Sequence, residues 1–377
     1  MILHNRLIHM KTWSSTPAIY PAIIVFFIAL TLVCITVVKN GGDPLTLARI
    51  GTRFSQGDPN GTKGYDGQFV YFIARNPDPL KVAANLDVPA YRYQRILLPL
   101  LARGLSMGND DLLPWIIALL GILSLAIGTW AVAELFKSWG VNSWYALVFG
   151  LWAGFLLALV TDLPEPLAYG LVACGILAIE HDRLTLGGCL LGFSIFAKEV
   201  TLLFILAAIV VYLYEHRWRE IIILGLFGIL PFAIFQIWLW SVYGQPGIGS
   251  GGAMATPFEW IPFMGLFRIG SYNPIYLLGM LVVFGPTILL PDVWGIWVSV
   301  KSWLANERNL IVTGLFINAL VIIFTPFSTF RETGGIIRFS SGLVLAVLLF
   351  AGRYRLRRAM NYSIFWLVLN VFLLKAG

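Results

Sequence analysis

Charge is scarce in this 377-residue chain, because Asp, Glu, Lys and Arg make up only 12% of it. Hydrophobic residues make up 58%, and the mean hydropathy is +0.81. These values exclude a soluble globular domain and indicate a membrane protein. Lys and Arg (26) exceed Asp and Glu (19), which gives a net charge of +7, but the cations are spread over many short connecting segments. We therefore expect no nucleic acid partner.

Cysteine and sequence repeats are also sparse or missing. The chain has three cysteines, all inside apolar runs without CxxC spacing, at Cys34, Cys174 and Cys189. They indicate small hydrophobic side chains and imply neither a disulfide framework nor a metal site. The sequence shows no internal repeat of the kind that marks many secondary transporters. A single transmembrane domain over 1–377 is the simpler prediction.

Long apolar runs, in contrast, are abundant. A helix needs about 20 apolar residues to cross about 30 Å of hydrocarbon, so the sequence predicts an all-α polytopic membrane protein with about eleven transmembrane helices. Their approximate cores are 18–38, 112–136, 144–161, 164–180, 184–197, 199–214, 221–243, 272–290, 309–327, 340–352 and 361–375. The first run ends without a small-residue cleavage site, so we expect a true span and not a signal peptide.

The distribution of Lys and Arg predicts the orientation. Connections on the side of the N-terminus hold Arg6, Lys11, Lys137, Arg183, Arg217, Arg219, Lys301, Arg308, Arg353, Arg355, Arg357 and Arg358. Outside the long first loop, the opposite side holds only Lys198, Arg268, Arg331, Arg338 and Lys375. The positive-inside rule therefore predicts a multi-pass protein of the cell membrane with a cytoplasmic N-terminus.

This orientation separates histidine from the outer face. All four histidines fall on the cytoplasmic side, at His4, His9, His181 and His216. Ser-His-Asp, Cys-His and zinc chemistry are therefore excluded on the outer face. That face offers carboxylates, Lys and Arg instead, and we place the function there. We expect no cofactor, with a divalent metal ion left open.

The longest outer segment is the first loop, 39–109, which is too polar to span and is expected to carry interfacial helices. It contains Gly64-Tyr65-Asp66-Gly67-Gln68, in which the flanking glycines permit a tight turn that presents one carboxylate. Asp66 is the candidate catalytic acid, and Tyr65 and Gln68 are candidate substrate-binding residues beside it. The alternative is a surface turn in which Asp66 only caps the helix that begins at Gln68.

Farther along the loop, Tyr91-Arg92-Tyr93-Gln94-Arg95 places two guanidiniums just before a short apolar stretch. Arg92 and Arg95 are candidates for contacting a lipid phosphate or for orienting Asp66. The alternative is an aromatic and basic belt that anchors a juxtamembrane helix, which is a common feature of membrane proteins.

Two further outer motifs carry paired charges. Asp162 and Glu165 lie three residues apart at the mouth of a span, although Pro164 and Pro166 make a regular helix there uncertain. Capping would explain Asp162, whereas an ionised Glu165 costs a few kcal/mol at that depth unless it has a partner. Lys198 and Glu199 separate two apolar runs and form either a local ion pair or, with Lys198, a site that neutralises phosphate. All four are candidate substrate-binding residues.

The last outer cluster surrounds Gly334 and Gly335 and contains Arg331, Glu332 and Arg338. Two guanidiniums near a lipid headgroup form a natural fork for phosphate oxygens. Arg331 and Arg338 are therefore candidate substrate-binding residues, with simple headgroup anchoring as the alternative.

A carboxylate beside cations at a membrane surface suits group transfer from a lipid-linked phosphate to an acceptor hydroxyl. The carboxylate would take the proton of the attacking hydroxyl, and Lys or Arg would stabilise the charge that gathers on the leaving phosphate. A lipid donor would also explain why the enzyme lies in the bilayer.

The first-loop turn at Asp66, the Tyr91–Pro99 segment, Asp162-Leu163-Pro164-Glu165-Pro166 and Ala197-Lys198-Glu199 together resemble bacterial members of the integral-membrane glycosyltransferase C superfamily. The resemblance covers roughly the first 200 residues and the pattern of spans. It implies a polyprenyl-phosphate-linked sugar as donor and carries the role of general base onto Asp66. The chain lacks the paired first-loop acids of many members and a large C-terminal soluble domain, so neither a metal ion nor a protein acceptor follows. The acceptor stays open as a glycan, a lipid or a protein.

Two other functions fit parts of the pattern. A transporter or lipid flippase would line a polar path with Asp162, Glu165 and Lys198. The gathering of charges on one side argues against it, because a translocation path should carry them through the midplane. A non-catalytic scaffold that binds a partner through the outer loop would leave the placement of Glu165 and Lys198 unexplained.

Overall fold

The computed structural model describes residues 17–375, and within this range it is helical with no strand. The all-α prediction is thus confirmed for the described residues. A helical chain is what a bilayer favours, because no water is present in the hydrocarbon to pair with backbone N–H and C=O groups, and a helix pairs these groups internally. Four residues used for the orientation and histidine arguments, His4, Arg6, His9 and Lys11, lie outside the described residues.

Within residues 17–375, five helices are long and apolar enough to cross a membrane. They are α1 (Ile19–Lys39), α7 (Leu113–Ser138), Trp218–Tyr243 with α13 (Trp218–Leu224) and α14 (Leu230–Tyr243), Pro274–Leu304 with α16 (Pro274–Phe284) and α17 (Leu290–Leu304), and Thr333–Arg353 with α20 (Thr333–Phe339) and α21 (Ser341–Arg353). Three apolar helical segments are shorter: α11 (Leu184–Ala197), Glu199–Tyr214 with α12 (Leu202–Tyr214), and α18 (Leu310–Ile323). The membrane character is supported, and the count of eleven spans stays a prediction.

Two of the expected spans are interrupted. The segment 144–161 forms a short 3₁₀ helix, η3 (Ser143–Tyr145), followed by α8 (Ala146–Gly150) and α9 (Ala153–Leu159). The break holds the fully buried Trp152, whose Nε1 donates to the Ile337 carbonyl at 3.1 Å. The segment 361–375 is divided between α22 (Arg357–Ile364) and the 3₁₀ helix η7 (Phe365–Lys375). The apolar composition of a segment does not reveal contacts with distant residues, so the sequence alone could not predict the break at Trp152.

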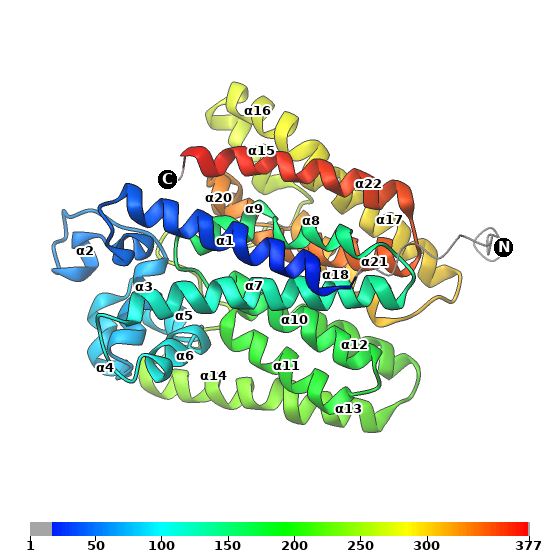
Figure 1. Cartoon of the computed structure of the whole chain (residues 1–377), viewed down its shortest axis with the longest axis horizontal. Helices are drawn as coiled ribbons and strands as arrows, with labels where there is room; N and C mark the ends of the chain where they lie inside the picture. Colours follow the sequence, from blue (N-terminus) through cyan, green and yellow to red (C-terminus); the bar gives the residue numbers. More distant parts are fainter. Residues whose placement is uncertain (1–16, 376–377) are drawn as a thin grey trace.

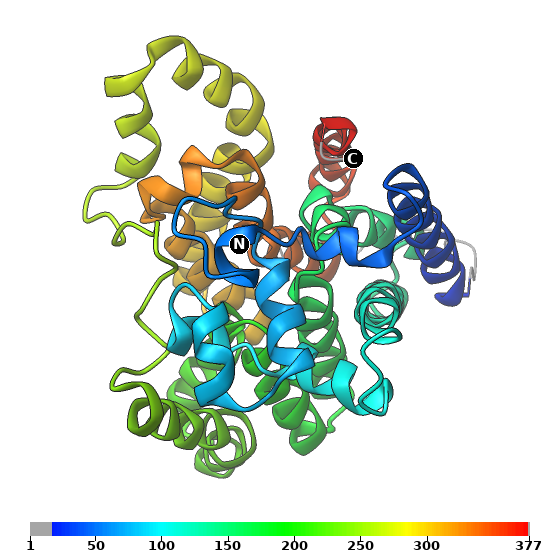
Figure 2. The same cartoon turned by 90° about the vertical axis from the view of Figure 1, so that its left-hand side faces the viewer.

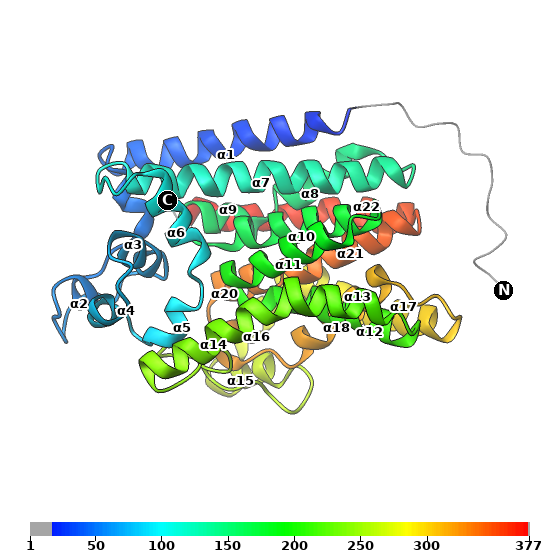
Figure 3. The same ribbon diagram turned by 90° about the horizontal axis from the view of Figure 1, so that it is seen from below.

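The long helices lie side by side along the longest axis of the molecule (Figures 1 and 3). α1 packs on α7, α7 packs on α10 (Glu165–Glu180), and α10 packs on α11. α7 and α10 approach closely at two glycines, since a Cβ on Gly128 would lie 2.8 Å from the Gly170 Cα. Small residues at a helix crossing allow such backbone contact. The connecting turns consequently gather at the two ends of the bundle.

The loop 39–109 folds into short helices that cover one end of the bundle (Figure 2). These are η1 (Pro44–Ala48), α2 (Thr52–Ser55), α3 (Gly67–Arg75), α4 (Pro79–Val82), η2 (Ala83–Asn85), α5 (Pro89–Tyr93) and α6 (Leu97–Leu105). Apolar residues of α3, including Phe69 and Ile73, are buried. The remaining short helices are α15 (Met264–Tyr272) and α19 (Phe327–Arg331). The loop therefore forms a packed platform on which charged side chains can be held.

Candidate functional site

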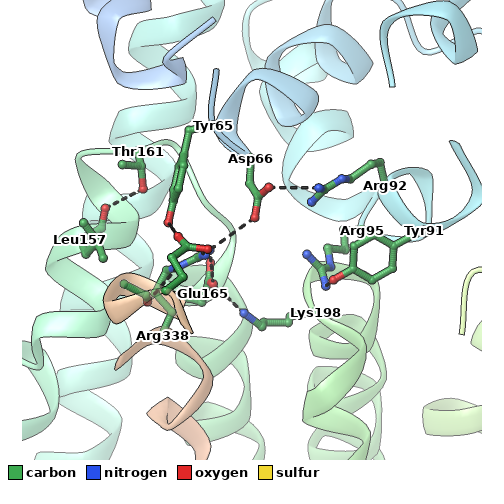
Figure 4. Close-up of polar contacts among 12 residues, drawn as sticks. Tyr65, Asp66, Tyr91, Arg92, Arg95, Leu157, Thr161, Glu165, Lys198 and Arg338 are labelled. Carbon is green, nitrogen blue, oxygen red and sulfur yellow. Dashed lines mark hydrogen bonds and ion pairs between the residues drawn. The ribbon is translucent and has the colours of Figure 1, made fainter. Parts of the chain in front are cut away.

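Charged side chains meet where the platform contacts the ends of α10, α11 and α20 (Figure 4). We call this group the charge cluster; it consists of Asp66, Asp87, Arg92, Arg95, Glu165, Lys198, Glu199 and Arg338. Its members come from four regions of the sequence that are far apart. The cluster contains most of the residues that the sequence nominated as a site.

The turn that carries Asp66 is fixed through its backbone. The Tyr65 N–H donates to the Arg49 carbonyl at 2.9 Å. The buried Gln68 side chain accepts from the Gly51 N–H at 3.1 Å and donates to the Lys63 carbonyl at 2.7 Å. Gln68, nominated as a substrate-binding residue, thus has its amide oxygen and nitrogen engaged in holding the loop. Its contacts in the structure are those of a structural residue.

Asp66 lies directly before α3, but its side chain makes no capping hydrogen bond to that helix. Its carboxylate instead lies between two guanidiniums, with Oδ1 3.1 Å from Arg92 Nη2 and Oδ2 3.7 Å from Arg338 Nη1 (Figure 4). The Asp66 side chain is 32% exposed, whereas those of Arg92 and Arg338 are 9% and 10% exposed. The carboxylate is therefore the accessible member of this group.

The electrostatics of the site favour an ionised Asp66. Burial opposes ionisation, but the guanidiniums of Arg92 and Arg338 outweigh it and hold the pKa of Asp66 below its usual value. A proton acceptor must be unprotonated to act, and this setting keeps Asp66 ionised at neutral pH.

Arg92 is itself positioned by Asp87, a residue that the sequence analysis did not nominate. Arg92 Nε lies 2.7 Å from Asp87 Oδ1, and Nη2 lies 2.9 Å from Oδ2. The Asp87 carboxylate also accepts the N–H groups of Val88 and Ala253. This two-point pairing fixes the plane of the guanidinium. The spacing of five residues between Asp87 and Arg92 was the only available signal.

Glu165 and Lys198 form a buried pair below Asp66. Glu165 begins α10, and Lys198 is the extended residue that ends α11. Lys198 Nζ lies 2.5 Å from Glu165 Oε1, and Arg338 Nη1 lies 3.4 Å from the same oxygen. Because Arg338 contacts both Glu165 and Asp66, it links the buried pair to the exposed carboxylate. The sequence expectation that Glu165 needs a partner is met by two cations.

Arg95 and Glu199 form a second pair within the cluster. Arg95 Nε and Nη2 lie 2.8 Å and 2.6 Å from the two Glu199 oxygens. Arg95 Nη2 also donates to the Tyr91 hydroxyl at 2.6 Å. The Tyr91 ring lies under both Arg95 and Arg92, 4.4 Å and 5.1 Å from their guanidinium carbons. Tyr91 therefore connects the two arginines, which anchoring of a helix alone would not require.

Tyr65 and Glu332 close one side of the cluster. The Tyr65 hydroxyl donates to Glu332 Oε1 at 2.6 Å, and the Arg338 guanidinium carbon lies 5.2 Å from the Tyr65 ring centre. Burial, together with nearby Glu332, raises the pKa of Tyr65 well above its usual value, so it acts as a hydrogen-bond donor. Arg331 does not join this group; it is exposed, with its guanidinium carbon 5.7 Å from the Phe327 ring centre.

Asp162 lies beside the turn without entering the ion pairs. A Cβ on Gly67 would meet the Thr161 carbonyl oxygen at 2.1 Å and the Asp162 Cβ at 3.3 Å. Asp162 is 3% exposed, has φ +50°, and neither of its carboxylate oxygens has a hydrogen-bond partner among the described residues. Burial raises the pKa of Asp162 well above its usual value and so favours the protonated form.

The groups that face Asp66 are cationic side chains. Within residues 17–375 there is no group of three or more His, Cys, Asp or Glu side chains placed to hold a metal ion. No protein-family model, curated protein or solved structure matches the chain. The functional interpretation consequently rests on the geometry of the charge cluster and on the chemistry that such a cluster can perform.

Proposed function

We propose that this protein is a membrane glycosyltransferase that transfers a sugar from a polyprenyl-phosphate-linked donor to an acceptor hydroxyl. The observation that carries the proposal is the Asp66 carboxylate, one-third exposed and held between Arg92 and Arg338. A carboxylate kept ionised beside fixed cations supports proton removal and stabilisation of a phosphate in one place.

The proposed step balances as follows. The acceptor oxygen forms a bond to the anomeric carbon while its proton passes to Asp66. The bond between the anomeric carbon and the phosphate oxygen breaks, and the phosphate leaves with the electron pair. Arg92 and Arg338, which contact Asp66, and Lys198, which contacts Glu165, supply the positive charge in the cluster that would stabilise the leaving phosphate.

The setting of the reaction belongs to the same proposal. The enzyme would lie in the cell membrane with about eleven spans, a cytoplasmic N-terminus and the charge cluster on the outer face. The lipid donor would reach the cluster from the bilayer, and its phosphate would meet cations at the ends of α11 and α20. The acceptor, a glycan, lipid or protein, would arrive from the outer aqueous side.

A transporter or lipid flippase is the second candidate, because Glu165 and Lys198 are a buried charge pair in an apolar bundle. The ion pairs around them gather at one end of the bundle, at the start of α10 and the end of α11. A translocation path would need such groups along its length. This arrangement favours chemistry at one surface.

Reconstitution tests the proposal. Purified protein in proteoliposomes is supplied with a set of radiolabelled polyprenyl-phosphate sugars and a panel of glycan, lipid and peptide acceptors. A glycosyltransferase gives a labelled acceptor and free polyprenyl phosphate in equal amounts. Movement of intact labelled lipid between leaflets with no chemical change would instead identify a flippase and refute the proposal.

A further inference from the structure

A polar cavity lies at the end of the bundle remote from the charge cluster. It has a volume of about 700 Å³ and forms where the α10–α11, α12–α13 and α17–α18 turns meet the end of α21. α10 connects the two places, since Glu165 at its start belongs to the charge cluster and Glu180 at its end lines the cavity. At about 1.5 Å per residue, the helix separates them by roughly 20 Å. Figure 3 shows α12, α13 and α17 opposite the platform helices.

Ion pairs account for only part of the charge in the cavity wall. Arg217 lies 3.4 Å from Glu215 and 3.0 Å from Glu220, and Arg353 lies 3.6 Å from Glu180. Two other lining arginines, Arg183 and Arg219, are exposed and have no ion pair among the described residues. Asp182, in a turn with φ +60°, is the one acidic lining residue that is likewise exposed and forms no ion pair among the described residues.

These unpaired groups define what the cavity can bind. Two guanidiniums can hold the oxygens of a phosphate, because their N–H groups match its geometry. Asp182 cannot accept an anion, but its carboxylate can accept hydrogen bonds from hydroxyl groups. The combination of Arg183, Arg219 and Asp182 therefore fits a phosphate that carries a hydroxylated substituent.

Apolar side chains form much of the rest of the wall, together with Thr185, Tyr212 and Asn309. Leu184, Ala208, Val211 and Ile223 line the cavity, and Leu186 at its edge is 48% exposed. A soluble phosphate compound would leave this apolar wall in contact with water, whereas an acyl chain would cover it. Exposed Tyr214 and Trp218 flank the turn, as aromatic residues do at a membrane interface. The cavity thus combines two arginines that form no ion pair among the described residues, Arg183 and Arg219, with several apolar side chains.

We propose that this cavity binds an anionic phospholipid whose headgroup carries free hydroxyls, with phosphatidylglycerol as the simplest example. Its phosphate meets Arg183 and Arg219, its headgroup hydroxyls donate to Asp182, and an acyl chain lies along Val211 and Ile223. Basic pockets at the ends of transmembrane helices bind lipid headgroups in this way. The site is separate from the charge cluster and does not depend on the proposed glycosyl transfer.

Native mass spectrometry with defined lipids tests this site. Purified protein is titrated with phosphatidylglycerol, with phosphatidic acid, with phosphatidylcholine, and with glycerol 1-phosphate as the soluble counterpart. The double variant Arg183→Gln/Arg219→Gln is compared with Lys301→Gln/Arg358→Gln, which removes the same charge from exposed residues at the same end of the bundle. The charge-retaining Arg183→Lys/Arg219→Lys variant shows whether a loss reflects charge or folding.

The proposal expects phosphatidylglycerol affinity to fall about tenfold or more in the Arg183→Gln/Arg219→Gln variant and to change little in the control. The Lys variant keeps the charge but loses the guanidinium geometry, so its affinity should fall by less than that of the Gln variant. Asp182→Asn should reduce the preference for phosphatidylglycerol over phosphatidic acid. Equal lipid retention by the two Gln variants, equal binding of phosphatidylcholine, or tighter binding of glycerol 1-phosphate would each overturn it. Lipid binding is read without any transferase activity, so this outcome is independent of the proposed function.

Discussion

Arg92 Nη2 lies 3.1 Å from Asp66 Oδ1, and the same guanidinium is held in place by Asp87. The candidate base is thus ion-paired to a cation that has its own fixed counter-ion. Arg92 lowers the pKa of Asp66, and its two-point pairing with Asp87 keeps the guanidinium in a fixed position beside the carboxylate. It implies a defined pH dependence for any reaction in which Asp66 accepts a proton.

Replacing Arg92 should move the acid limb of the pH profile. A general base acts when ionised, so if Asp66 has this role, activity should be lost as pH falls through its lowered pKa. Arg92→Gln removes a cation that lowers this pKa, and the acid limb of kcat/KM should shift to higher pH. Arg75→Gln, an exposed arginine of α3, is the control and should leave the profile unchanged. An unmoved acid limb in Arg92→Gln would show that another group is the base.

Gly67 should tolerate no side chain. A Cβ at this position would lie 2.1 Å from the Thr161 carbonyl oxygen, so the start of α3 would have to shift and carry Asp66 with it. Because a displacement of about 1 Å can cost about 100-fold in rate, Gly67→Ala should lose most transfer activity. In the control Gly104→Ala, the added Cβ has nothing within 4 Å. Equal activities of the two variants would contradict the close packing that positions the turn.

Removing one charge of the Glu165–Lys198 pair should destabilise the protein more than removing both charges. Glu165→Gln leaves buried Lys198 without its carboxylate and should destabilise the protein by about 3–5 kcal/mol. Glu165→Gln/Lys198→Met removes both charges and should recover part of that loss. Thermal unfolding in detergent measures the effect, with the exposed Lys137→Gln expected to change stability by less than about 1 kcal/mol. A double variant less stable than Glu165→Gln would exclude this explanation.

The sequence predicted the composition of the site better than its contacts. The glycine-flanked turn indicated Asp66, the cost of a charge at membrane depth indicated Glu165, and the ability to contact phosphate indicated Arg92, Lys198 and Arg338. The structure brings these residues together. Their pairings join distant segments, and no local pattern reveals which carboxylate meets which cation.

The same limit explains the residues that fit less well. Asp87 was missed because its only signal was the five-residue spacing to Arg92. Gln68 was predicted to bind a ligand, although its amide holds the backbone of the loop. Arg331 shares a motif with Arg338 but is exposed beside Phe327. Apolar composition predicted a helical bundle, but it could not predict the break at Trp152, which depends on a hydrogen bond to Ile337.

Transfer by Asp66→Asn tests the central claim most directly. The variant keeps the size of the side chain and removes the proton acceptor, so it should fold and insert normally while transfer from labelled polyprenyl-phosphate sugar falls by about 10²- to 10⁴-fold. Asp111→Asn, the same substitution at an exposed residue after α6, should keep full activity. Full activity in correctly folded Asp66→Asn would contradict the account, because no carboxylate at this position would then be needed.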